Sequence, residues 1–125
     1  MSWSGRPSRF ILRVIESSDK HVRKTAGDML QAVIVGSPVD EGTFRGNHRV
    51  SLDSPSDEKD AGVNDKDGNA TARKGLNILK SAKFGGLIYI QNNMPYSVRL
   101  EDGYSKQAPD GVYRVAFQAV SEKNK

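Results

Sequence analysis

The amino-acid sequence predicts a single α+β domain: a long N-terminal amphipathic helix packed on a small, mostly antiparallel sheet, with a long polar loop. Three observations carry this prediction. The chain has 125 residues, the size of one ordinary domain. Apolar residues recur at spacings of three, four and seven between Ile11 and Val33, which is typical of one helix face. Residues 48–52 alternate polar and apolar, and residues 87–92 are β-branched and aromatic, so both favour strands.

The first helix is expected to open at Pro7, where a missing N–H is harmless, and to end before Gly36-Ser37-Pro38. It would span about 28 residues, or about 42 Å at the usual rise. Its polar face would be basic. That face is either a solvated surface or a surface that contacts nucleic-acid phosphates. The candidate DNA-facing cations are Arg9, Arg13, Arg23 and Lys24.

The rest of the chain is divided by its polar stretches. Residues 1–6 are expected to form a flexible arm, and residues 121–125 a frayed tail. Residues 53–75 contain little apolar material and are interpreted as a variable polar loop, followed by a short helix over 76–83. The pattern over 112–120 fits both a helix and a strand, and we favour the helix.

Composition excludes several classes of protein. There is no Cys, which removes disulfide scaffolds, Cys-ligated zinc and thiol nucleophiles. No apolar run approaches the roughly 20 residues of a membrane span, and the first residues contain no apolar core of signal-peptide length, so we expect a soluble protein that is used without secretion. The formal charge is +4, from 19 Lys and Arg against 15 Asp and Glu. Residues 53–67 hold six acids and two lysines, a balance of −4, so the remainder carries +8.

No catalytic or metal-binding pattern is found. His21 and His48 have no partner at ligand spacing and are expected to be surface or capping residues. A calcium loop with Gly68 at its sixth position would place Val63 first and Lys74 twelfth, where carboxylates belong. The phosphate-binding loop and the nucleophile elbow are both missing. We therefore expect a protein that is not an enzyme and needs no metal and no cofactor.

Two segments resemble a known family. Residues 37–47, Ser-Pro-Val-Asp-Glu-Gly-Thr-Phe-Arg-Gly-Asn, resemble the Pro-Val-Asp-x-Gly-x-(Leu/Phe)-Arg-x-(Ser/Asn) segment of small tailed-phage neck proteins. Residues 88–112 resemble that family's Asn-x-x-Pro-Tyr-x-x-x-(Leu/Val)-Glu-x-Gly-x-Ser-x-Gln-Ala-Pro-x-Gly signature. The family is the head–tail joining or tail-completion group, similar to the minor tail protein Z of lambdoid phages. Asp102, Tyr104 and Asp110 depart from its pattern.

The resemblance implies a structural protein of the virion at the head–tail junction, made in the cytoplasm of the bacterial host. Such proteins assemble as a ring, here of six or twelve copies, that completes the tail or neck and lets DNA pass. The implied partners are the adjacent connector, head-completion and tail-terminator or tail-tube proteins, with non-specific DNA contact and no membrane. The alternatives are a small basic nucleic-acid-binding protein and an enzyme that uses a carboxylate.

The two motifs supply the candidate interface residues. Either the motifs hold only the turns of their own domain, or the same turns also contact a neighbouring subunit. Arg45 and Glu101 can pair within the domain or across a subunit boundary. The candidates for the subunit or partner interface are Asp40, Thr43, Phe44, Arg45, Asn93, Pro95, Tyr96, Glu101, Gly103, Ser105, Gln107 and Pro109.

Overall fold

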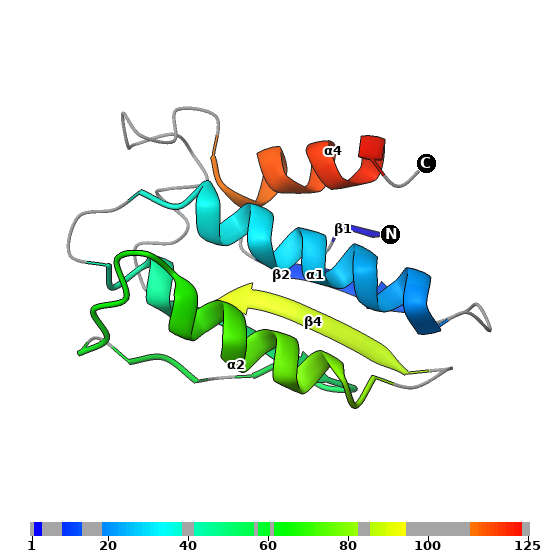
Figure 1. The fold of residues 1–125 in the computed structure, drawn as a ribbon, viewed down its shortest axis with the longest axis horizontal. Helices are drawn as coiled ribbons and strands as arrows, with labels where there is room; N and C mark the ends of the chain where they lie inside the picture. The colour runs from blue at the N-terminus through cyan, green and yellow to red at the C-terminus, as the bar shows by residue number, and fades with distance from the viewer. Residues whose placement is uncertain are drawn as a thin grey trace.

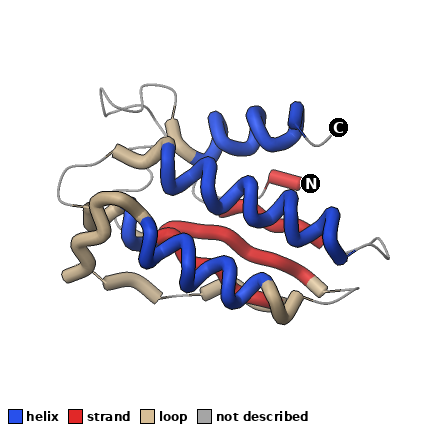
Figure 2. Tube along the Cα trace, viewed as in Figure 1, coloured by secondary structure: helices blue, strands red, loops and turns tan. Residues whose placement is uncertain are grey.

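A computed structural model describes residues 2–3, 9–13, 19–38, 42–56, 58–60, 62–82, 86–94 and 111–123. Its elements follow the order β1, β2, α1, a short 3-10 turn, β3, α2, β4 and α4 (Figure 1). The described part of the chain is an α+β fold, as the sequence predicts. Its helices lie together on one side of the strands (Figure 2).

The four strands form one antiparallel sheet in the order β1-β2-β4-β3. Strand β4 (Leu87–Asn92) runs through its centre, with β2 (Arg9–Arg13) on one side and β3 (His48–Leu52) on the other. The two-residue strand β1 (Ser2–Trp3) extends the sheet beyond β2. The predictions of strands over 48–52 and 87–92 are confirmed.

Three helices cover one face of this sheet. Helix α1 (Asp19–Val35) lies between α2 (Asn69–Leu79) and α4 (Tyr113–Lys123) and contacts both (Figure 1). Apolar side chains of α1 and of the inward-facing strand positions form the core, including Met29, Leu30, Val33, Ile34, Val50, Ile88 and Ile90. Among the described helices, none is long and apolar enough to cross a bilayer.

The prediction of a 28-residue N-terminal helix is wrong in its first third. Residues 9–13 form β2, and α1 begins only at Asp19. The sequence Arg-Phe-Ile-Leu-Arg suits a strand as well as a helix, and pairing of its whole length with β4 decides between them. The helix ends at Val35, as predicted. Two residues of the predicted flexible arm, Ser2 and Trp3, pair with β2.

The predicted polar loop over 53–75 is shorter than expected, because α2 begins at Asn69. Preceding carboxylates satisfy the free N–H groups of its first turn. Asp67 Oδ1 accepts from the Asn69 N–H at 2.9 Å, and Asp65 Oδ2 accepts from the Thr71 N–H at 2.9 Å and its hydroxyl at 2.6 Å. Burial by itself raises the pKa of Asp65, but the hydrogen bonds that its carboxylate makes, chiefly with Thr71, together lower the pKa below its ordinary value.

The segment near the C-terminus is helical, so the favoured interpretation of 112–120 is confirmed. Helix α4 continues to Lys123, three residues into the predicted frayed tail.

Candidate functional site: the junction of the two motifs

The described residues of the first motif, 37–38 and 42–47, close the end of α1. Arg45 carries most of this contact: its Nη2 donates to the carbonyls of Ser37 at 2.7 Å and Val35 at 3.3 Å. Its Nη1 donates to the carbonyl of Lys66 at 2.9 Å. A cation at the C-terminus of a helix is favoured by the helix dipole. Phe44, the neighbouring candidate interface residue, is 5% exposed and belongs to the core.

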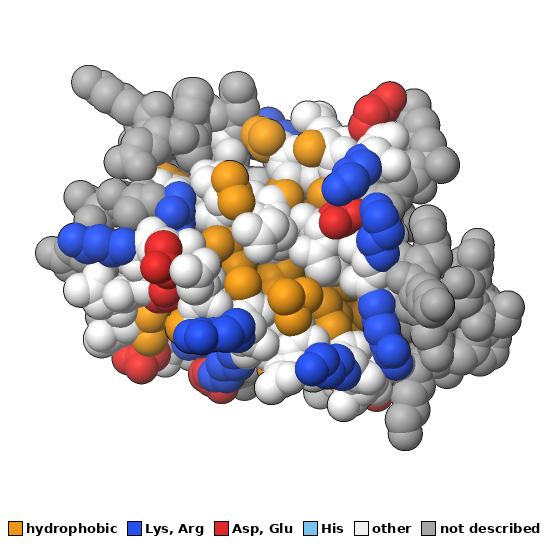
Figure 3. Space-filling view, viewed as in Figure 1, with side chains coloured by type: hydrophobic (Ala, Val, Ile, Leu, Met, Phe, Trp, Pro, Cys, Tyr) orange, Lys and Arg blue, Asp and Glu red, His pale blue; other side chains and the backbone are white. Residues whose placement is uncertain are grey.

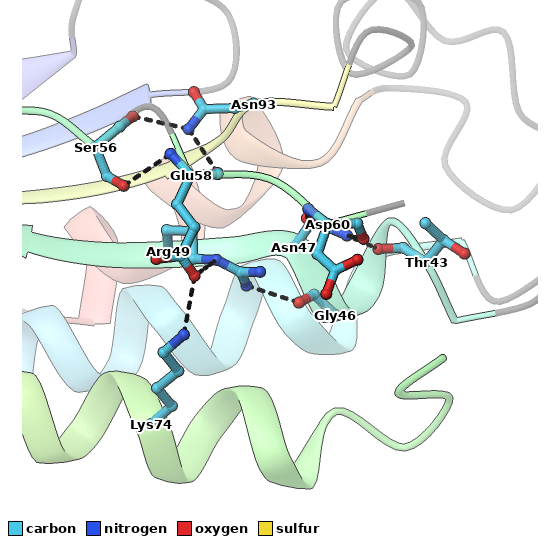
Figure 4. A network of polar contacts seen from close by, with 9 residues as sticks. All are labelled: Thr43, Gly46, Asn47, Arg49, Ser56, Glu58, Asp60, Lys74 and Asn93. Atoms are coloured by element: carbon cyan, nitrogen blue, oxygen red, sulfur yellow. Dashed lines mark hydrogen bonds and ion pairs between the residues drawn. The ribbon is translucent and has the colours of Figure 1, made fainter. Parts of the chain in front are cut away.

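Asn47, the last residue of this motif, fastens the polar loop to the turn. Its side chain is fully buried and makes three hydrogen bonds (Figure 4). Its Nδ2 donates to the carbonyls of Thr43 at 2.6 Å and Asp60 at 2.9 Å, and its Oδ1 accepts from the Asp60 N–H at 2.7 Å. The neighbouring Gly46 approaches Val63 so closely that an added Cβ would overlap Cγ1. The loop is therefore an integral part of the fold.

The second motif overlaps β4, and its Asn-x-x-Pro-Tyr signature begins at Asn92, where β4 ends beside the first motif. Asn92 Nδ2 donates to the carbonyl of Phe44 in the first motif, at 2.9 Å. Asn93 Nδ2 donates to the carbonyls of Ser56 at 2.8 Å and Glu58 at 3.0 Å (Figure 4). We call residues 54–56 and 58–60 the strap, because they cross between the two motifs and are bonded to both. The sequence motifs and the polar loop thus converge on one junction.

Two cations share one carboxylate oxygen of the strap. Glu58 Oε1 lies 2.8 Å from Arg49 Nε of β3 and 2.9 Å from Lys74 Nζ of α2 (Figure 4). Arg49 Nη1 also donates to the carbonyl of Gly46 at 2.8 Å. The hydrogen bond from Lys74 lowers the pKa of Glu58, as does the positive charge of Arg49, although desolvation opposes them. The strap is therefore bound to both the sheet and α2.

His48 lies in the core of the junction, so the prediction of a surface or capping histidine is wrong for this residue. It is 2% exposed. Its Nε2 lies 2.6 Å from Ser37 Oγ, and its Nδ1 lies 2.8 Å from the Tyr113 hydroxyl. Because Ser37 Oγ donates its only hydrogen to the Val33 carbonyl at 2.5 Å, Ser37 accepts from Nε2–H. The pattern assigns the neutral Nε2–H tautomer, whose Nδ1 accepts from Tyr113.

The environment of His48 opposes its protonation. Burial, followed by the positive charges of Arg49 and Arg45, lowers its pKa from the ordinary 6.5 to about 3. At neutral pH the ring is an uncharged link between β3, the end of α1 and the start of α4. The burial of His48 was predictable from the alternation over residues 48–52, because the alternation places His48 on the same face of the strand as Val50.

The four predicted DNA-facing cations do not share one helix face. Arg9 and Arg13 lie in β2, whereas Arg23 and Lys24 lie in α1. Lys24 Nζ pairs with Asp28 at 3.0 Å, an ordinary surface contact. On the helical side of the molecule, basic side chains with acidic ones among them lie around an apolar centre (Figure 3). The basic helix face on which the DNA interpretation depended is therefore not formed.

The other candidate interface residues divide into two groups. Thr43 and Asn93 are half-buried. Thr43 adjoins Phe44 and Arg45 in the first motif, whereas Asn93 bonds the strap and is connected to the first motif through the strap and through Asn92. The predicted pairing of Arg45 with Glu101 involves a residue outside the described part of the chain. The remaining candidates also lie outside it, namely Asp40, Pro95, Tyr96, Glu101, Gly103, Ser105, Gln107 and Pro109.

Comparisons of this chain with protein-family models, with curated proteins and with solved structures find no match. Within the described residues, no group of three or more His, Asp or Glu side chains is placed to hold a metal ion.

Asn47→Ala should destabilise the fold by about 2–4 kcal/mol, because it leaves two carbonyls and one N–H at the junction without their partners. Urea unfolding at pH 7 measures the change. The matched control is Asn64→Ala, since Asn64 is exposed in the following loop, and it should change stability by less than about 0.5 kcal/mol. Equal effects of the two substitutions would contradict the role assigned to Asn47.

Proposed function

We propose that this chain is a structural protein of the phage head–tail junction, assembling as a ring that completes the tail or neck and lets DNA pass. One observation carries the proposal. The two segments that resemble neck proteins are more than 40 residues apart in sequence, yet Asn92 of the second bonds the Phe44 carbonyl of the first at 2.9 Å. Motifs that meet at one place are expected to serve one role.

The contacts within the junction support this proposal, because they give the first motif a firm base. A closed ring needs two different surfaces on each copy, held at a fixed angle. The contacts of Arg45, Asn47 and His48 tie α1, β3 and α4 to the strap and its loop, so the motif turns are held rigidly. The second motif continues from this rigid base. The proposed neighbours are the connector, head-completion and tail-terminator or tail-tube proteins.

Nucleic-acid binding remains the alternative, but the structure weakens the main observation that supported it. It depended on a continuous basic face of one helix, and the cations concerned lie on a strand and a helix. DNA passing through a ring needs only contacts that ignore sequence. If direct binding were the main function, the logarithm of the DNA affinity would fall with the logarithm of salt concentration, with a slope near −0.9 per phosphate neutralised.

The solution mass, measured by light scattering at several concentrations and salt levels, tests the proposal. We expect a discrete multimer of about six or twelve copies, visible as rings by electron microscopy. Tyr96→Ala and Glu101→Lys, both in the second motif, should reduce the multimer to monomers without changing the circular dichroism. The matched charge reversal Glu122→Lys, on the exposed side of α4, should leave the multimer intact.

A monomer at every concentration, with salt-dependent DNA binding of several phosphates, would overturn the ring proposal in favour of the alternative. A multimer that survives both substitutions in the second motif would keep the ring but exclude those residues from its interface.

A further inference from the structure

A cavity of about 160 Å³ lies between α2, β3 and the loop that precedes α2. Its apolar lining includes Val50, Val63 and Ile78. Arg49 and Lys74, the two cations that share Glu58, also line it. The cavity thus combines room for a small apolar side chain with two positive charges, a combination typical of specific binding sites.

The charges of the cavity lining are unbalanced by one. Arg49 and Lys74 contribute +2 and Asp65 contributes −1, so the lining carries +1. Glu58 does not line the cavity but supplies the compensating negative charge from the strap. The Arg49 side chain is only 9% exposed, so leaving its charge without a carboxylate partner would be costly. One carboxylate makes this site neutral, and in the free protein it comes from the same chain.

The Glu58 carboxylate can be displaced from Arg49 and Lys74 while the strap stays in place. The Glu58 side chain is 53% exposed, and only Oε1 contacts the two cations. The strap itself is held by neutral hydrogen bonds: Asn93 bonds two of its carbonyls, Asn47 bonds Asp60, and Gln91 Oε1 accepts from the Ser56 N–H at 3.2 Å. A second carboxylate can therefore take the place of Glu58 on Arg49 and Lys74.

We propose that Arg49, Lys74 and the adjoining cavity bind an acidic segment of a partner protein, and that Glu58 occupies the carboxylate position until that partner arrives. The partner's carboxylate would contact the two cations, and a neighbouring apolar side chain would enter the cavity beside Val50 and Ile78. Charge complementarity selects this occupant. The proposal goes beyond the ring function and does not depend on it, since a monomer can bind in this way.

Titration of the Glu58→Gln variant with a blocked leucine–glutamate–leucine tripeptide, followed by NMR chemical shifts, tests the proposal. A tethered competitor acts at an effective concentration in the millimolar range, so its removal should tighten peptide binding about tenfold relative to the native chain. The matched leucine–glutamine–leucine peptide should not bind. Adding Lys74→Met to the variant should abolish the gain, whereas adding Lys80→Met, on an exposed lysine at the end of α2, should not.

Three results would overturn the proposal: no tighter binding by folded Glu58→Gln than by the native chain, equal binding of the glutamine peptide, or equal binding of inorganic phosphate, which would mark a general anion site. Should Glu58→Gln fail to fold, Glu58→Asp provides the same test. Its shorter side chain cannot reach both cations, so peptide binding should still tighten, by a smaller factor. Unchanged binding by Glu58→Asp would then overturn the proposal.

Discussion

Gly68→Ala should destabilise the protein by about 2–5 kcal/mol. Gly68 precedes α2 with φ of 78°, a left-handed conformation that costs an L-residue about 1–2 kcal/mol. A Cβ at this position would also overlap Cγ2 of Ile34, which is 2% exposed in α1. Relief of that overlap requires a shift in a packed core, with a further cost of about 1–3 kcal/mol. Urea unfolding of the two proteins at pH 7 measures the difference.

The opposite sign is expected for Gly27→Ala, which serves as the matched control. Gly27 lies within α1, where alanine is preferred to glycine by about 1 kcal/mol. Its added Cβ would meet Leu76 Cδ2 at 3.4 Å, an ordinary contact with a half-exposed side chain. The variant should therefore be more stable than the native chain. Two glycine substitutions that change stability in the same direction would contradict this account.

The second large effect is a loss of stability as the pH falls below 6.5. His48 has a pKa of about 3 in the folded chain and 6.5 when unfolded, so between these values only the unfolded state takes up the proton. The stabilisation is complete above pH 6.5 and declines by about 1.4 kcal/mol for each pH unit below it. Unfolding free energies at pH 7 and pH 5 should differ by about 2 kcal/mol.

The contribution of His48 can be separated from those of other groups by its pH range and by substitution of the histidine. Because the folded chain lowers the pKa values of Glu58 and Asp65, protonation of these two groups also costs the protein stability in acid. That loss occurs only below their ordinary pKa values of 4.5 and 3.8. His48→Gln should lower stability at pH 7, because Gln cannot bridge both hydroxyl partners, and should flatten the profile between pH 7 and pH 5. A profile that is flattened by His21→Gln instead would assign the titration to the other histidine.

The local sequence is sufficient to predict those helices and strands whose apolar residues follow a clear periodic pattern. Strands β3 and β4 were predictable because their side chains alternate or are β-branched, and turn residues bound them. The start of α1 was not predictable in this way, because residues 9–13 fit both the helical and the strand pattern. Only their pairing with β4 shows that they form a strand. The start of α2 depends on hydrogen bonds that Asp65 and Asp67 accept from its first turn, and both residues resemble loop residues when the sequence is considered alone.

The junction was predictable in part. The motif residues identify the turn that Phe44 and Arg45 form, but their spacing does not show that Arg45 closes the end of α1. Asn47 was not distinguishable from other turn asparagines, because its partner Asp60 lies in a loop with no periodic pattern. The ion pairs of Glu58 join three separate elements, and such contacts follow from tertiary packing rather than from local sequence.

The position of β4 in the sheet sets the order in which the chain can fold. Arg9 pairs with Gln91 and His48 pairs with Asn92, so both neighbours of β4 are synthesised long before it. A growing chain therefore exposes two unpaired strands until residues 87–92 leave the ribosome. Because contacts between distant segments form slowly, completion of the sheet is expected to limit the folding rate. Early in synthesis, these unpaired strands are the segments most exposed to aggregation.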